Sequence, residues 1–380
     1  MLTESVRSWA PDDVGFTDAQ IEAARVVVTE QLADVELAFL AGSLAVGLGH
    51  GTSDIDLYVV GPDLPAAEVV HEHRGIPVHV NPLSAAKVRE LVAIADVYRT
   101  TGADRSQAAI HVKTLNSLVR LAGGQRLLVS PAWAEELARL DANVVRQILM
   151  VRNGNVASAY AEDVSGALAT GDLLTAVSAS ALALESACEA ALAASGDLYV
   201  GPKFLFRRLA RTRELGAWCD LVFWLNNQNV PRNKVGWLTA QRLNAAAVLL
   251  AWCATDGWEG LPGTLPAPPG EWPPYAPGPL RNVYFTPLRF ADGWALIGPE
   301  DGFEVSECVV RLWGGLDGRP LAEVVNSVPD IGLEEAADAV AQLVRFGAVR
   351  PAQPAAQGKL FIRRAPQFSV HPKAAVGGAA

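Results

Sequence analysis

The stretch AGSLAVGLGHGTSDIDLYVVG, residues 41–61, places a Gly-Ser pair ahead of a glycine-rich turn and an Asp-Ile-Asp triplet inside an apolar run. The β-branched run Ile55–Val60, which ends at a Gly-Pro pair, predicts a buried strand. On that strand Asp54 and Asp56 point to the same face, about 7 Å apart. Two neighbouring carboxylates repel each other unless a cation lies between them, so the pair predicts a site for a hard divalent ion such as Mg²⁺.

The Gly-Ser pair, Gly42 and Ser43, lies between another apolar run, residues 35–40, and a predicted short helix, residues 44–47. Glycine lets the backbone approach a ligand closely, and the serine hydroxyl and the helix amides can hold phosphate. The alternative is a surface turn that carries two solvated aspartates. We disfavour it, because an uncompensated charge within the run IDLYVV is costly.

Together these residues resemble the signature of the nucleotidyltransferase superfamily of DNA polymerase β type, and its small-molecule and antibiotic members in particular. The signature stands here as Leu40–Ser43, then Ser53 and Asp54–Leu57, and the resemblance covers roughly residues 17–100. It implies a small mixed sheet, with Asp54 and Asp56 as ligands of one or two Mg²⁺ ions. It also implies that Gly42, Ser43 and Ser53 bind the nucleotide.

The same family carries a third carboxylate on a later strand, where this sequence has IPVHVNPLS and His79 between two valines. Three alternatives remain open. His79 can act as the base or as a metal ligand, because imidazole titrates near neutral pH. The acid can come from elsewhere, or the protein can bind nucleotide and do little chemistry. The candidate acids are Glu72, Glu136, Asp163 and Glu185.

The alanine-rich helical region that follows resembles the helical domain that closes over the catalytic sheet in such enzymes. Within it, Lys203, Arg207 and Arg208 are spaced to present positive charge on one helix. The functional interpretation is a triphosphate clamp at Lys203 and Arg207. The alternative is a solvated basic face, which is nearly as good for Arg208.

Proline at high density in residues 261–282 predicts a semi-rigid linker. Residues 283–351 beyond it resemble the PqqD-like peptide-recognition element, a small winged-helix module. The resemblance implies that a peptide adds a strand at the edge of the strand pair Val283–Leu288 and Trp294–Ile297. A dimerisation module is the alternative. The last helix, residues 332–346, is too acidic for DNA phosphates.

The sequence thus predicts an α+β protein with a catalytic domain at 1–104, a helical domain at 105–260, the linker, the winged-helix module and a loose tail at 352–380. The formal charge of −10 argues against general nucleic-acid binding. We expect no membrane span and no secretory signal, and four scattered cysteines suit a reduced cytoplasmic protein. Two functions compete: Mg²⁺-dependent transfer from a nucleoside triphosphate to a small-molecule or peptide acceptor in natural-product biosynthesis, or a degenerate nucleotide- and peptide-binding adaptor.

Overall fold

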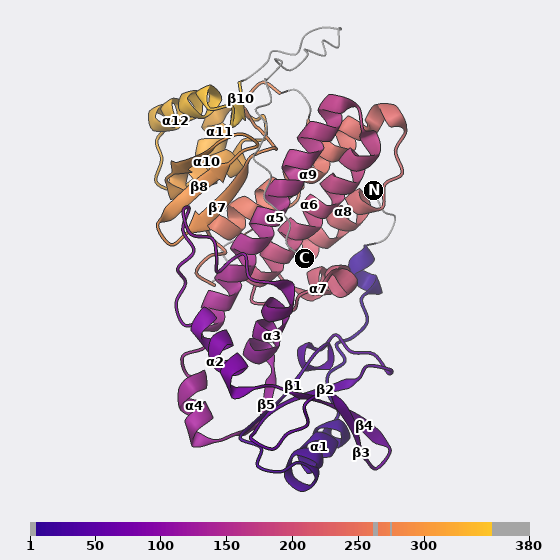
Figure 1. The fold of residues 1–380 in the computed structure, drawn as a ribbon. Helices are drawn as coiled ribbons and strands as arrows, with labels where there is room; N and C mark the ends of the chain where they lie inside the picture. Colours follow the sequence, from indigo (N-terminus) through magenta and orange to yellow (C-terminus); the bar gives the residue numbers. More distant parts are fainter. Residues whose placement is uncertain (1–4, 261–264, 274–275, 352–380) are drawn as a thin grey trace.

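The computed structural model describes residues 5–260, 265–273 and 276–351. It is an α+β protein, as the sequence predicts, with a sheet at one end, a helical bundle that extends from it to the other end, and a smaller α/β module packed beside the far half of the bundle (Figure 1). The predicted tail at 352–380 lies outside the described residues.

The first sheet is mixed and has the strand order β3-β4-β2-β1-β5. Strands β2 and β4 run parallel, and the other neighbours are antiparallel. The bounds are β1 Leu37–Ala41, β2 Ile55–Val60, β3 Val69–His73, β4 Ile76–Pro82 and β5 Gln125–Val129. The sequence predicts the first four within two residues but misses β5, which joins the sheet only because the chain returns to pair with β1.

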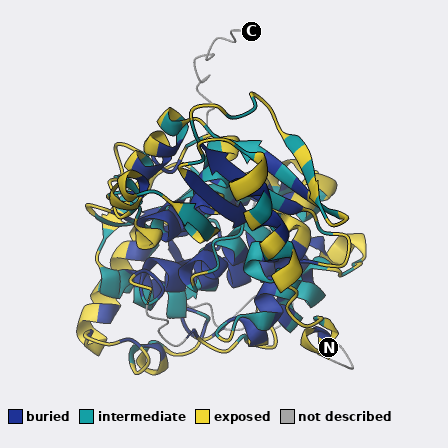
Figure 2. Ribbon diagram, turned by 90° about the horizontal axis from the view of Figure 1, so that it is seen from below, coloured by how far each residue is buried: buried dark blue, intermediate teal, exposed yellow. Residues whose placement is uncertain are grey.

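Helices cover both faces of this sheet, so that its strands form a buried layer. Helix α1 (Asp18–Val26) begins at a capping box between Thr17 and Gln20 and packs on one face. Helices α2 (Ala85–Ile94) and α3 (Val112–Gly123) lie over the other. Seen from the sheet end, buried strands occupy the centre and exposed segments surround them (Figure 2).

The helical part differs from its prediction in where the helices break. The sequence predicts one helix over residues 131–152 and a second over 156–169. The structure splits the first into α4 (Pro131–Leu137) and the start of α5 (Ala142–Thr170), because Asp141 caps a new helix, and α5 continues through the predicted break before Val156. The others are α6 Leu173–Ala194, α7 Leu205–Arg211, α8 Gly216–Asn226 and α9 Val235–Ala254, with short 3-10 turns at 202–204 and 232–234.

Helix α6 is the one helix in the described part of the chain that is long and apolar enough to cross a membrane. Most of its apolar stretch is buried against α5 and α9, as in the core helix of a soluble protein. The cysteines Cys188, Cys219, Cys253 and Cys308 are unpaired.

The C-terminal module contains the three helices that the sequence predicts at 306–316, 320–327 and 332–346, and its described residues form three strands beyond the predicted pair. One sheet has the order β7-β8-β9, and β6 and β10 form a separate two-stranded sheet. The bounds are β6 Leu280–Arg281, β7 Thr286–Phe290, β8 Gly293–Ile297, β9 Gly302–Val305, α10 Glu307–Gly315, α11 Leu321–Val325, α12 Leu333–Arg345 and β10 Val349–Arg350. The β7–β8 pair therefore does not offer the free edge that the sequence suggests: β8 pairs with β9, and β7 packs on α5 and α9.

The proline-rich segment is attached to the bundle rather than held apart from it. Trp272 is buried beside Trp218, and Gln241 of α9 exchanges two hydrogen bonds with the backbone of Trp272. Leu288 and Phe290 of the module belong to the same apolar core as the helical bundle. These contacts fix the module against α9, so the expected spacer is a packed segment over its described residues.

Candidate functional site

The aspartate pair lies where strands β1, β2 and β4 meet. Asp56 is opposite Ala41 of β1 and next to His79 of β4. Gly42, directly after β1, has a positive φ of 83°, and a Cβ placed there would lie 2.5 Å from Asp56 Oδ2. Glycine is therefore required at this position, both for its backbone conformation and for the approach of the carboxylate. The Gly-Ser pair and the aspartates, eleven or more residues apart in sequence, form one site.

A pocket of about 230 Å³ opens beside this site. Gly42, Ser43 and Asp56 line it from the sheet, and Arg120 of α3 and Lys203 also line it. The remaining wall comes from the segment 198–204 and from α3. Ser43 makes no capping hydrogen bond to the three-residue turn Leu44–Val46 that follows it. The pocket thus combines one carboxylate, two cationic side chains and a serine hydroxyl.

The electrostatics of the pair favour a cation. Burial raises the pKa of Asp56 above its ordinary value, Arg120 lowers it, and the neighbouring Asp54 raises it again. The ionised form of Asp56 is therefore less stable in the folded protein than in water. Asp54 remains 72% exposed at its side chain, so the pair is open to a ligand on one side.

His79 points to the same face as the aspartates, as strand alternation predicts. Its Nε2 lies 3.8 Å from Asp54 Oδ1, and its Nδ1 lies 2.9 Å from Oε1 of Glu68. The hydrogen bond with Glu68 raises the pKa of His79, and Asp54 and Asp56 raise it further against the opposing effect of burial. The strand position at which the sequence resemblance implies a third acid thus holds an imidazole whose protonated form is stabilised by three carboxylates.

Glu68 is the acidic residue that sequence reasoning missed. It lies directly before β3, in which Val70 is opposite His79. Glu68 and Val70 are two residues apart and share a face, so the hairpin register contains the signal that could have identified it. Glu72 lies on the same face of β3 as Val70, but it is at the turn end of the hairpin, opposite Pro77 rather than His79.

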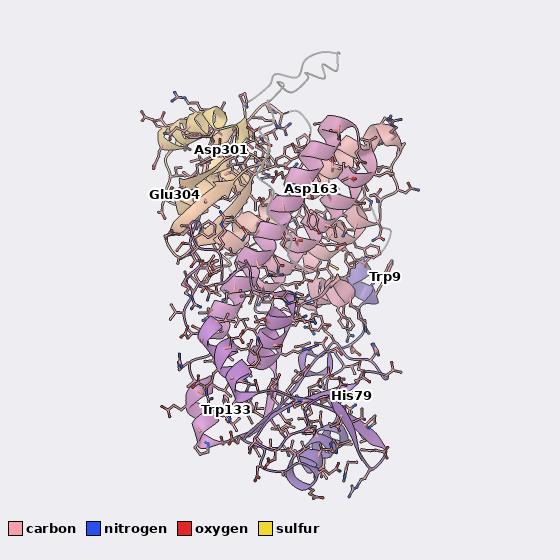
Figure 3. The ribbon with its side chains drawn as sticks, viewed as in Figure 1. Trp9, His79, Trp133, Asp163, Asp301 and Glu304 are labelled. Atoms are coloured by element: carbon pink, nitrogen blue, oxygen red, sulfur yellow. The ribbon has the colours of Figure 1, made fainter. Side chains whose placement is uncertain are left out.

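The other acids considered from the sequence lie elsewhere. Glu136 pairs with Arg139, and Glu185 accepts a hydrogen bond from Asn226. Asp163 is on α5, far along the bundle from His79 (Figure 3). None of these three acids is among the described residues that line the pocket beside Asp56.

Two of the predicted nucleotide-binding residues have other partners in the structure. The Ser53 hydroxyl accepts a hydrogen bond from the backbone of His50 and so closes the turn before β2. Arg207 donates to the carbonyls of Asp12, Gly47, Leu48 and Gly49 at 2.9–3.2 Å. Arg207 therefore stabilises the glycine-rich turn through its backbone carbonyls. Of the two residues predicted to bind the triphosphate, Lys203 is the one that lines the pocket.

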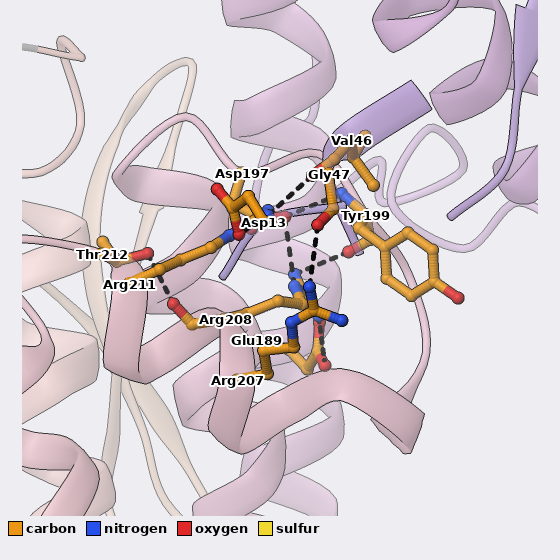
Figure 4. A network of polar contacts seen from close by, with 10 residues as sticks. All are labelled: Asp13, Val46, Gly47, Glu189, Asp197, Tyr199, Arg207, Arg208, Arg211 and Thr212. Carbon is orange, nitrogen blue, oxygen red and sulfur yellow. Dashed lines mark hydrogen bonds and ion pairs between the residues drawn. The ribbon is translucent and has the colours of Figure 1, made fainter. Parts of the chain in front are cut away.

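The neighbouring arginines of α7 belong to a closed network (Figure 4). Arg208 is fully buried and pairs with Glu189 at 2.8 Å and with Asp197 at 3.1 Å. Its Nη2 also donates to the carbonyl of Tyr199, a residue of the pocket wall. Arg211 bridges Asp197 and the carbonyl of Val46. This network, defined here as the α7 arginine network, fixes both the pocket wall and the turn after Ser43.

Mg²⁺ fits the donor set at the aspartate pair. Carboxylate oxygens are the ligands that Mg²⁺ prefers, and it is commonly held by one or two carboxylates together with substrate phosphates. Within the described residues no group of three or more His, Cys, Asp and Glu side chains is arranged to hold a metal alone. Asp54 and Asp56 are therefore the residues that would hold the ion.

Comparison with known proteins gives little beyond this. No family model matches the chain, and no curated protein matches it. One similar solved structure is a nucleotidyltransferase-like protein from Exiguobacterium sibiricum 255-15, with 10% identity and a TM-score of 0.33 over 62% of this chain and 79% of that one. A likeness at that level says nothing about individual side chains, so the function below rests on the geometry of the site.

Proposed function

We propose that the protein is a Mg²⁺-dependent nucleotidyltransferase that moves a nucleoside monophosphate from a nucleoside triphosphate to a small-molecule or peptide acceptor. The observation that supports this most is the pocket that Gly42, Ser43, Asp56, Arg120 and Lys203 line together. A triphosphate needs cationic partners for its oxygens and close backbone approach, and both are available there.

The chain's own residues divide the work. Asp54 and Asp56 would hold the ion, whose charge would stabilise the negative charge that develops on the phosphoryl oxygens and on the leaving pyrophosphate. Lys203 and Arg120, which line the same pocket, would orient the triphosphate. Ser43 offers a hydroxyl, and Gly42 leaves the space in which Asp56 approaches the backbone.

His79 is the residue to which we assign proton handling. In the metal-free site its raised pKa favours the protonated form, which donates hydrogen bonds and cannot accept a proton. A cation at Asp54 and Asp56 would offset the contribution of these two carboxylates to the raised pKa, while the hydrogen bond with Glu68, its largest cause, would remain. The neutral imidazole is the form that would accept the proton of an acceptor hydroxyl.

The test is direct measurement of pyrophosphate release. The full chain is incubated with each of the four ribonucleoside triphosphates, Mg²⁺ and a panel of hydroxyl- and amine-bearing acceptors, with a chelator as the control. We expect release with at least one nucleotide only when metal and acceptor are both present. If calorimetry detects no binding of any triphosphate with Mg²⁺, the proposal is wrong.

A second candidate is a nucleotide- and peptide-binding adaptor without transferase activity. The observation that favours it is the imidazole at the third acidic position, which is already paired with Glu68. The C-terminal module would supply the peptide role through its open β9 edge. Triphosphate binding without pyrophosphate release, for every acceptor in the panel, would select this candidate.

A further inference from the structure

The C-terminal module carries a groove of about 700 Å³ between strand β9 and helix α12. Its floor is apolar and its rim is acidic. The apolar residues include Phe303, Val305, Val309, Leu343 and Phe346, and the acidic ones are Glu304, Glu334, Glu335 and Asp338. No Lys or Arg is among the described residues that line it. Glu304 lies on the outer side of the module, away from the bundle (Figure 3).

Strand β9 forms one edge of its sheet. It pairs with β8 on one side, and no described strand pairs with it on the other. Natural edge strands are commonly protected by Lys, Pro or a bulge, and the sequence Gly302–Val305 has neither Lys nor Pro. Phe346, which stacks on Phe303 at 4.9 Å, is nevertheless 59% exposed. The groove thus offers backbone hydrogen bonds and an uncovered aromatic surface.

The chain itself contains a segment that complements this groove. Residues 352–380, which enter here by their sequence alone, include four Lys or Arg and no Asp or Glu, in a chain of net charge −10. Three of the four lie in KLFIRR, residues 359–364. In an extended segment Leu360 and Ile362 fall on one side. Those two side chains match the apolar floor, and the flanking cations match the acidic rim.

The connection is also long enough. Phe346 is a groove residue, and only five positions separate it from Pro351, the last described residue. Residues 352–358 then supply seven further residues, which can span at most about 23–25 Å when extended. The KLFIRR segment is therefore tethered close to the groove.

We propose that the segment Lys359–Arg364 of this chain binds in the β9–α12 groove by pairing with β9. It would then occupy the edge that a peptide acceptor needs, so that a peptide must displace it. Only this regulatory consequence rests on the proposed peptide role. The docking itself does not depend on nucleotide binding or transfer, and its test uses no nucleotide.

Hydrogen exchange of the full chain at the amides of residues 302–305 tests the docking. A segment tethered at an effective concentration of about 1 mM, with an intrinsic Kd of about 0.1 mM, is docked about ten times more often than free. We therefore expect Leu360→Asp with Ile362→Asp to speed exchange of these amides by about tenfold. Val376→Asp, an apolar tail residue outside the segment, is the matched control and should change nothing.

Charge reversal sharpens the test. Arg363→Glu with Arg364→Glu should also speed β9 exchange, and adding Glu334→Lys with Glu335→Lys in the same chain should restore the protection. Exchange that is identical in the wild type and in every segment variant would overturn the proposal. Protection that rises with protein concentration would also overturn it, because it would place the segment of a second copy in the groove.

Discussion

Asp56 of the sheet lines the pocket, whereas Arg208 and Arg211 of α7 hold the carbonyls of two of its wall residues, and the two groups differ in what satisfies their charge. Asp54 is mostly exposed and lies 3.8 Å from His79, and burial raises the pKa of Asp56 although the nearby Arg120 partly opposes that rise. Arg208 instead is fully buried and paired with two carboxylates. A charged side chain without an ion-pair partner in the protein can bind a ligand, whereas one that is paired within the protein stabilises the fold.

The largest effect expected from this contrast is on activity. Asp54→Asn or Asp56→Asn should reduce nucleotidyl transfer by about a thousandfold, since a lost metal ligand removes about 4 kcal/mol of transition-state stabilisation. Pyrophosphate release at saturating Mg²⁺ measures it. Asp63→Asn, an exposed acid after β2, is the control that should retain activity. Full activity in both site variants would rule out the metal role.

The same variants should not lose stability. The folded-state pKa of Asp56 is raised, so its ionised form opposes folding above that pKa, and the penalty disappears as the pH falls through it. Removal of the charge with Asp56→Asn should therefore leave the Tm at pH 7 equal or higher. A lower Tm at that pH would show that the carboxylate is a structural group.

The α7 arginine network should respond in the opposite way. Arg208→Met should lower the free energy of unfolding by about 3–5 kcal/mol, because it leaves Glu189 and Asp197 buried without their cation. Denaturant unfolding measures the loss. Arg211→Met, at a side chain 24% exposed, is the matched control with a smaller loss. An equal loss of unfolding free energy in the two variants would show that the deeper burial of Arg208 does not make its ion pairs more important for stability.

Lys203 and Arg207 extend the comparison to two neighbouring cations. Lys203→Ala should raise the Kd for a triphosphate with Mg²⁺ by about tenfold and leave stability unchanged, since Lys203 lines the pocket. Arg207→Ala should cost about 1–3 kcal/mol of stability, because carbonyls of the glycine-rich turn lose a charged donor. Calorimetry and thermal unfolding separate the two. A loss of stability in Lys203→Ala, or weaker triphosphate binding with unchanged stability in Arg207→Ala, would contradict the roles that we assign to these two residues.

The smallest effect concerns His79 and pH. Because the folded-state pKa of His79 is raised, its stabilising contribution is complete below the ordinary value of 6.5 and is lost as the pH rises through the raised value. Glu68→Gln should lower that pKa in the metal-free protein, with less than about 1 kcal/mol of stability at stake for this partly exposed pair. NMR titration of the His79 ring measures it, and an unchanged pKa would show that Glu68 is not its main partner.

Much of the sheet could be predicted from local pattern. The apolar runs predict β1 and β2 because buried strands select β-branched and aliphatic residues, and the Arg74-Gly75 turn marks the β3–β4 hairpin. Strand β5 and strand β9 were missed. Each becomes a strand because another part of the chain lies beside it, and neither is a run of buried apolar residues such as β1.

The site was predicted in part for a similar reason. The face shared by Asp54, Asp56 and His79 follows from a period of two within strands. Glu68 required the hairpin register, and Arg120 required the position of α3 over the sheet. Arg207 and Lys203 are four residues apart on neighbouring turns, and nothing local says that one faces the pocket and the other faces backbone carbonyls.

The sequence by itself determined the aspartate pair, the glycine that accommodates it and the α+β order of elements, because each depends on residue type and short-range spacing. Tertiary structure alone decided which charges are left for a ligand. An arginine on α7 can bind a ligand only if folding leaves it without protein partners. Here folding brings the carbonyl of Asp12 to Arg207 and the carboxylates of Glu189 and Asp197 to Arg208, so both arginines stabilise the protein instead. The residue type sets the charge of a side chain, but the fold decides whether that charge has a hydrogen-bond or ion-pair partner within the protein.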